Sequence, residues 1–123
     1  MPYTVNYNDT KNCILVKVEG ELNLELLQKI ASDVSRLVEK KGCRYILNDL
    51  RLASTTHNVL NIYQMPGVAK EAGLFPACKR ALVVGQRASD FHFLETVFRN
   101  QGHLVKMFTT IEEAEAWLLE APK

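Results

Sequence analysis

The sequence lacks three features that would have placed the chain in a specialised class of protein. It has no apolar run approaching the roughly 20 residues that a membrane-spanning helix needs. It has no surplus of one charge, because 15 basic and 14 acidic residues leave a formal net charge of +1. Binding to a phosphate backbone normally requires a basic excess. We therefore expect neither integral membrane association nor nucleic-acid binding.

Paired cysteines and histidines are also missing. Cys13, Cys43 and Cys78 are odd in number and far apart, which argues against both a disulfide framework and a zinc knuckle. His92 and His103 fall on different predicted elements, so they lack the close spacing of two helical metal ligands. Residues 1–5 show none of the charge-then-apolar order of a secretory leader. We expect a cytoplasmic protein without a metal or a cofactor.

What the chain does contain is enough apolar material for one core of ordinary size. Its 123 residues are 47% hydrophobic, and no linker, internal repeat or low-complexity segment interrupts them. The sequence therefore predicts a single domain over residues 1–123.

The first half of the chain predicts a hairpin, a helix and a third strand. Residues 3–7 alternate apolar and polar, residues 13–19 are rich in β-formers, and the turn chemistry of residues 8–12 lies between them. Asn23 can cap a helix whose apolar positions recur at three- and four-residue steps, and Gly42 can stop it in the left-handed conformation. The next strand covers residues 45–50.

The second half repeats this alternation of helices and strands. Asn58 can cap a second helix that Pro66 ends or kinks, and Ser89 or Asp90 can cap a third that ends at Gly102. Strands are predicted at residues 81–84 and 104–108, and residues 110–113, Thr-Ile-Glu-Glu, read as a capping box before the last helix. The order is β-β-α-β-α-β-α-β-α. With right-handed crossovers it gives an α/β fold, with four helices on a mixed five-stranded sheet that opens with an antiparallel hairpin.

Three segments in order resemble a known family. They are residues 18–23 (Val-Glu-Gly-Glu-Leu-Asn), residues 46–50 (Ile-Leu-Asn-Asp-Leu), and residues 108–114 (Phe-Thr-Thr-Ile-Glu-Glu-Ala) followed by Trp-Leu at 117–118. Together they are similar to a STAS domain. More narrowly, the chain resembles the stand-alone bacterial SpoIIAA-like proteins, which are relatives of anti-sigma-factor antagonists and of the cytoplasmic tail of sulfate transporters. The likeness spans nearly the whole length.

This resemblance implies a regulatory binding module that has no chemistry of its own. Anti-sigma-factor antagonists dock a kinase-like partner through the loop and helix after the third strand, so we expect a protein partner to bind there. Those antagonists carry a phosphorylated serine in an Asp-Ser-Ser-Gly segment, whereas this chain has His-Asn-Val-Leu at residues 57–60. The expected contact residues are Asp49, the hydroxyl cluster Ser54, Thr55 and Thr56, and His57, Asn58, Asn61, Ile62 and Tyr63.

The hydroxyl cluster has two interpretations. Ser54, Thr55 or Thr56 can accept a phosphate near a helix N-terminus, where the dipole and free amides stabilise negative charge. Such residues more often satisfy backbone groups in turns and caps, and this second interpretation is favoured.

An enzyme is not expected. Asp49, Ser54 and His57 have the residue types of a nucleophilic triad, but the sharp Gly-x-Ser-x-Gly turn is absent. We interpret Asp49 as a structural residue that receives amides at the end of its strand.

A small-ligand carrier or sensor is the alternative function. Residues 62–76 bring Tyr63, Met65, Leu74 and Phe75 around a predicted kink with few charges. The favoured interpretation is that they cap the sheet core, but an exposed apolar surface here would suit a homodimer, a partner or a lipid cleft. Residues 83–90 connect a strand to a helix and include Arg87, which can pair an anion, although a single glycine makes a weak phosphate motif. A lipid, a nucleotide or another anion, bound in a cleft lined by Tyr63, Met65, Phe75 and Phe91, therefore stays open as a ligand.

Overall fold

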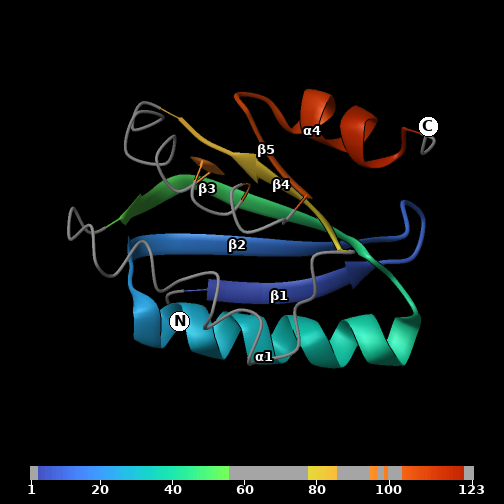
Figure 1. Cartoon of the computed structure of the whole chain (residues 1–123), viewed down its shortest axis with the longest axis horizontal. Helices are drawn as coiled ribbons and strands as arrows, with labels where there is room; N and C mark the ends of the chain where they lie inside the picture. The colour runs from blue at the N-terminus through green and yellow to red at the C-terminus, as the bar shows by residue number, and fades with distance from the viewer. Residues whose placement is uncertain (1–2, 56–77, 86–94, 97–98, 100–103, 121–123) are drawn as a thin grey trace.

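A mixed five-stranded sheet organises the part of the chain that the structure describes (Figure 1). The structure is a computed structural model, and it describes residues 3–55, 78–85, 95–96, 99 and 104–120. The strands lie in the order in which they occur in the sequence, and only β1 and β2 are antiparallel. The predicted sheet and its opening hairpin are confirmed. The strands are β1 (Tyr3–Asn8), β2 (Cys13–Leu22), β3 (Tyr45–Thr55), β4 (Lys79–Val83) and β5 (Leu104–Phe108).

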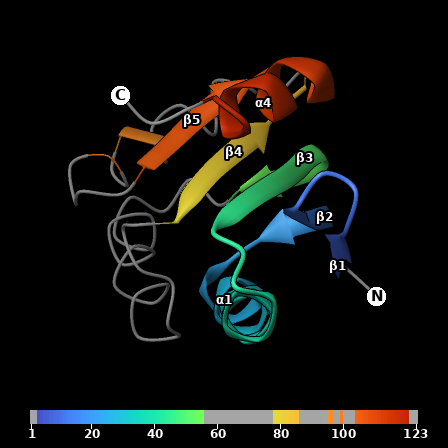
Figure 2. The same cartoon turned by 90° about the vertical axis from the view of Figure 1, so that its right-hand side faces the viewer.

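Two helices of the described residues cover opposite faces of this sheet (Figure 2). They are α1 (Leu24–Lys41), which lies against β1 and β2, and α4 (Ile111–Leu118), which lies against β3, β4 and β5. Within the described residues, neither helix is long and apolar enough to cross a bilayer. The second predicted helix lies outside the described residues. Of the third, the structure describes Glu95, Thr96 and Arg99, and all three have helical backbone. A total of four helices stays a prediction.

The core has two layers, because the central strands are buried on both faces. In β3, Ile46 packs in the layer on the α1 side and its neighbour Leu47 in the layer on the α4 side. Alternation of this kind lets one apolar run supply both layers. The α4 layer is completed by Ala114 and Leu118, with Ile111 and Trp117 packed against it, as the helical spacing of the last element predicted.

Both described helices begin at the predicted caps. The Asn23 side chain accepts a hydrogen bond of 2.8 Å from the Leu26 amide, and the Thr110 hydroxyl oxygen accepts one of 3.2 Å from the Glu113 amide. The second bond of the capping box differs from the predicted one, in which the glutamate side chain accepts from the backbone amide of the capping residue. Here the Thr110 hydroxyl donates to the Glu113 carboxylate at 3.0 Å. Asn23 and Thr110 still satisfy amides that a helix N-terminus leaves free.

Two lysines attach α4 to the rest of the molecule. Lys11, in the turn between β1 and β2, forms an ion pair of 2.5 Å with Glu115. Lys79 donates to the carbonyl of Trp117 and lies 4.4 Å from the centre of its ring. A cation at a helix C-terminus complements the negative end of the dipole, so Lys79 stabilises both the helix end and the packed indole.

Gly42 ends α1 in the left-handed conformation that the sequence predicted, with φ +64° and its amide bonded to the Val38 carbonyl at 2.9 Å. No neighbouring atom lies within 4 Å of the place where a Cβ would stand, so a side chain here is opposed by the backbone conformation alone. We expect Gly42→Ala to lower the free energy of unfolding by about 1 kcal/mol. Urea denaturation measures the change. Gly42→Asn should lose less, because asparagine tolerates this conformation better; equal stability of all three proteins would contradict the explanation.

Candidate functional site

The third strand is longer than the sequence predicted. The prediction ended it at Leu50, but β3 continues to Thr55 because β2 is also long and pairs with the extra residues. The register shifts on the way: Lys17 pairs with Asp49, whereas Glu19 pairs with Leu52. Two residues of β3 therefore stand opposite the single residue Val18 of β2. This arrangement is a β-bulge.

This bulge reverses the faces to which the last residues of β3 point. Before it, Asp49 lies on the sheet face that α4 partly covers; after it, Leu52 and Ser54 lie on that same face, opposite Glu19 and Glu21 of β2. A strand without a bulge would have turned Leu52 and Ser54 into the core, because side chains alternate with period two. Instead Ala53 enters the core at 4% exposure, and Leu52 is left 62% exposed.

Asp49 is buried at 6% exposure and is held by Arg51, two residues further along the strand. The Arg51 guanidinium donates two hydrogen bonds to the carboxylate, of 2.9 Å from Nε and 2.8 Å from a terminal nitrogen. The Arg51 amide adds a third at 3.2 Å. A bidentate contact of this kind fixes the orientation of both groups. The interpretation of Asp49 as structural is consistent with this geometry, in which its amide partner is Arg51.

The electrostatic consequence is a carboxylate that stays ionised. Hydrogen bonds from the Arg51 side chain lower the pKa of Asp49 from its ordinary 3.8, and they outweigh the burial that would raise it. Lys17, opposite Asp49 in the register, lowers the pKa further. Asp49 is thus a poor proton carrier near neutral pH, because a general base or acid needs a pKa near the working pH.

The structure brings together only part of the predicted site. Asp49, Ser54 and Thr55 lie along one strand, with Ser54 half-buried. Gly85, after β4, lies close to this strand, since a Cβ on it would stand 3.6 Å from the Arg51 carbonyl oxygen. The other predicted contacts lie outside the described residues: Thr56, His57, Asn58, Asn61, Ile62 and Tyr63.

The ligand cleft of the alternative function is untested for the same reason. Tyr63, Met65, Phe75 and Phe91 all lie outside the described residues, as does Arg87 of the predicted anion loop. The carrier or sensor alternative therefore stays a prediction.

The strand geometry separates two members of the triad considered above. Asp49 and Ser54 are five residues apart on β3, which corresponds to about 16 Å at the usual rise of a strand. Neighbouring groups of a catalytic triad are joined by direct hydrogen bonds, so one imidazole cannot bridge this distance. Asp49 and Ser54 do not belong to one triad.

Sequence reasoning missed Arg51 and Leu52. Arg51 was detectable, because residues i and i+2 of a strand share a face and oppositely charged side chains there can meet. Exposure of Leu52 was not detectable, because it depends on the bulge, and an isolated leucine in a β-rich segment usually reads as core.

The comparisons with known proteins bear on the fold. No family model and no curated protein matches the chain. Among solved structures, an anti-sigma factor antagonist from Mycobacterium paratuberculosis matches with a TM-score of 0.62 at 15% identity, over 96% of this chain and 95% of that one. An uncharacterized protein with a SpoIIAA-like fold from Shewanella loihica matches with a TM-score of 0.64 at 12% identity, over 94% and 93%. The chain has a SpoIIAA-like fold.

SpoIIAA itself is a further match. Its unphosphorylated form, described as an anti-sigma factor antagonist, gives a TM-score of 0.52 at 15% identity, over 94% of this chain and 96% of that one. The expectation of a SpoIIAA-like fold with a mixed five-stranded sheet is confirmed. The surface built by the bulge lies at the end of the third strand. The resemblance implied contacts in the loop and helix after that strand, and these lie outside the described residues.

Asp49→Asn tests the ion pair. We expect it to lower the free energy of unfolding by about 1 kcal/mol near neutral pH, because a charged hydrogen-bond acceptor is lost. Folding lowers the Asp49 pKa, so the native protein gains stability above pH 3.8 and loses it as the pH falls through the folded-state value. The difference between the two proteins should therefore shrink from about pH 6 to about pH 3, as measured by urea denaturation.

A second variant shows whether Asp49 acts through Arg51. In an Arg51→Gln background, Asp49→Asn should have a clearly smaller effect, because the partner is already gone. An undiminished effect would mean that the Asp49 carboxylate stabilises the fold through some other contact.

Proposed function

We propose that this chain is a cytoplasmic, non-enzymatic regulatory module that binds a protein partner through the end of β3 and the segment after it. The proposal treats residues 1–123 as one STAS-like domain. The observation that carries it is the exposure of Leu52, a large apolar residue displayed by the bulge beside charged groups. Interfaces concentrate binding energy in a few anchors of this kind, surrounded by a polar rim.

The comparisons support this proposal at the level of the fold. The structures matched include anti-sigma factor antagonists, among them SpoIIAA, whose unphosphorylated and phosphorylated forms both match. One fold hosts many functions, so the surface residues must carry the specific claim. Here they are Leu52 and Ser54 in the described part, continued by Thr55 to Tyr63 along the chain.

The charges around Ser54 argue that it is a contact residue and not a phosphate acceptor. Ser54 stands opposite Glu21, and Glu19 is on the same face one pair away. Neighbouring strands are about 4.8 Å apart, so a phosphate on Ser54 would meet carboxylates at close range. Like charges placed in this way destabilise the modified state. A partner that approaches this surface would need basic or hydroxyl groups facing Glu19 and Glu21.

Leu52→Lys tests the surface, with Leu104→Lys as the matched control. Leu104 is also an exposed leucine at 52%, but it lies on β5 at the far edge of the sheet. The tagged protein is cross-linked in its own cells, and co-purifying proteins are quantified by mass spectrometry. We expect Leu52→Lys to reduce recovery of the partner about tenfold or more, because a charge would then enter the apolar centre of the interface.

The control should recover the partner at the level of the unmodified protein. Thr55→Glu and Asn58→Asp extend the test into the segment after β3, and each should also weaken capture. Circular dichroism establishes that every variant is folded. Equal capture by all of the folded variants would show that this surface is not the binding site.

A further inference from the structure

The two edge strands of the sheet, β1 and β5, differ in the contacts that their outward backbone groups make. An edge strand presents unpaired amides and carbonyls that can pair with another chain, and natural proteins usually protect them. On β5, the Phe108 carbonyl accepts a hydrogen bond from the Val84 amide, which places the backbone groups of Phe108 on the side of β4. The backbone groups of Val105 and Met107, at alternate positions of the strand, therefore point away from β4. Two of these four outward backbone groups have side-chain partners.

These partners cover the β5 edge. The Arg99 Nε donates to the Val105 carbonyl at 2.7 Å, and the Glu95 carboxylate accepts from the Met107 amide at 2.6 Å. A foreign strand would have to displace both contacts before it could pair with β5. Strand addition at this edge is therefore opposed by two side-chain contacts.

The β1 edge has none of these protections within the described residues. All six residues of β1 pair with β2 in one unbroken register, and no other described strand lies beyond them. Residues 3–8, Tyr-Thr-Val-Asn-Tyr-Asn, contain no charge, no proline and no bulge. Those are the devices by which edges normally avoid pairing, so β1 offers an uncharged strand without a bulge.

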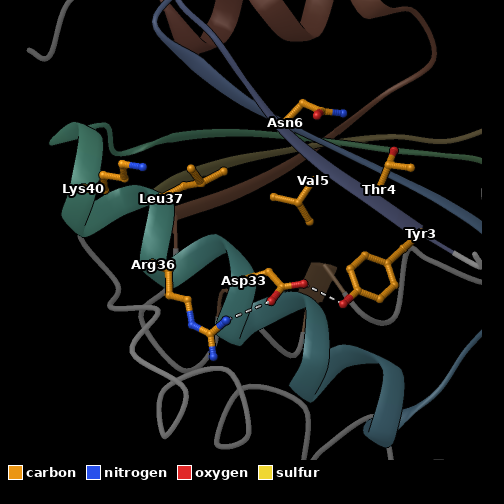
Figure 3. Close-up of a pocket in the computed structure, with 8 residues that line it drawn as sticks. All are labelled: Tyr3, Thr4, Val5, Asn6, Asp33, Arg36, Leu37 and Lys40. Carbon is orange, nitrogen blue, oxygen red and sulfur yellow. Dashed lines mark hydrogen bonds and ion pairs between the residues drawn. The ribbon is translucent and has the colours of Figure 1, made fainter.

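A groove runs between this open edge and α1 (Figure 3). This groove is open to solvent and has a volume of about 620 Å³. The side chains of Val5 and Leu37 lie within it, whereas those of Thr4 and Asn6 point to the other side of the sheet. The inward side chains of β1 are only half-buried. An added strand would therefore place alternate side chains in the groove and cover apolar surface that the chain alone leaves exposed.

Basic side chains dominate the rim of the groove. Arg36, 82% exposed, and Lys40 both line it, and Lys41 extends the charge to a position 5.4 Å from the centre of the Tyr7 ring. The one acid in the lining, Asp33, accepts a 2.6 Å hydrogen bond from the Tyr3 hydroxyl and lies 3.8 Å from Arg36. The groove is thus complementary to negative charge.

We propose that β1 and this groove bind an extended acidic peptide of a partner protein as an added strand next to β1. Backbone hydrogen bonds to β1 supply affinity, and alternate side chains of the peptide meet Val5 and Leu37 or the cations of α1. A second copy of the chain is a poorer occupant, because pairing through β1 would bring two sets of Arg36 and Lys40 together. This surface is separate from the one at the end of β3.

The test uses a fluorescein-labelled peptide of about eight residues in which glutamate and valine alternate. Fluorescence anisotropy compares the unmodified protein, the double variant Arg36→Glu with Lys40→Glu, and the control Lys29→Glu. Lys29 is an exposed cation of the same helix that pairs with Glu25 and does not line the groove. We expect the double variant to bind at least about tenfold more weakly and the control to bind within about twofold of the unmodified protein.

Two further peptides separate strand addition from simple charge attraction. A lysine and valine peptide should bind at least about tenfold more weakly, and so should the glutamate peptide methylated on alternate backbone nitrogens, because it cannot pair with β1. Hydrogen exchange should show β1 amides slowed by the unmodified peptide.

Three results would overturn the proposal. They are no binding of the glutamate peptide, equal binding of the methylated or lysine peptides, and unchanged binding by the folded double variant. No peptide binding, together with a dimer in sedimentation that Arg36→Glu with Lys40→Glu alters, would favour a second copy as the occupant of this edge and would equally reject the peptide. None of these results depends on Leu52. Rejection of peptide binding along β1 would therefore not affect the function proposed for the end of β3, which has its own test.

Discussion

One extra residue in β3, opposite Val18 of β2, decides what the end of the sheet presents to the surroundings. Up to Asp49 the strand alternates in step with β2; beyond the bulge the alternation is shifted by one residue. Arg51 lies at this shift and bonds back to Asp49, so the buried carboxylate has a partner. Ala53 closes the core, while Leu52 and Ser54 turn outward. The proposed binding surface follows from that single irregularity.

The two sheet edges show a second constraint of the same kind. On β5, Arg99 and Glu95 occupy two of the outward backbone groups, whereas β1 is a strand that carries no charge. Within the part of the chain that the structure describes, β5 is thus the better protected edge, and we propose that an added strand pairs with β1. The basic side chains of α1 then select which strand is complementary. The two proposed protein-binding surfaces, one at the end of β3 and one along β1, are therefore separate.

Local chemistry explains which parts of the fold were predictable. Asn23, Gly42 and Thr110 act on groups a few residues away, so their roles as caps could be read directly and are confirmed. The strand at residues 104–108 was predicted with its exact bounds. The end of β3 was wrong by five residues, because its continuation depends on pairing with β2, a segment far away in the sequence. Most of the predicted contacts after β3 lie outside the described residues and stay predictions.

The sequence by itself determined the class of fold, since periodicity and capping are local properties that specify each element and the order of elements restricts the sheet. Only the tertiary structure decided which side chains face outward at the end of β3 and which sheet edge has side-chain partners on its backbone groups among the described residues. Both outcomes depend on register between strands and on side chains such as Glu95 and Arg99 reaching another element. A shift of one residue in register moves a side chain to the opposite face, and no local pattern encodes that shift.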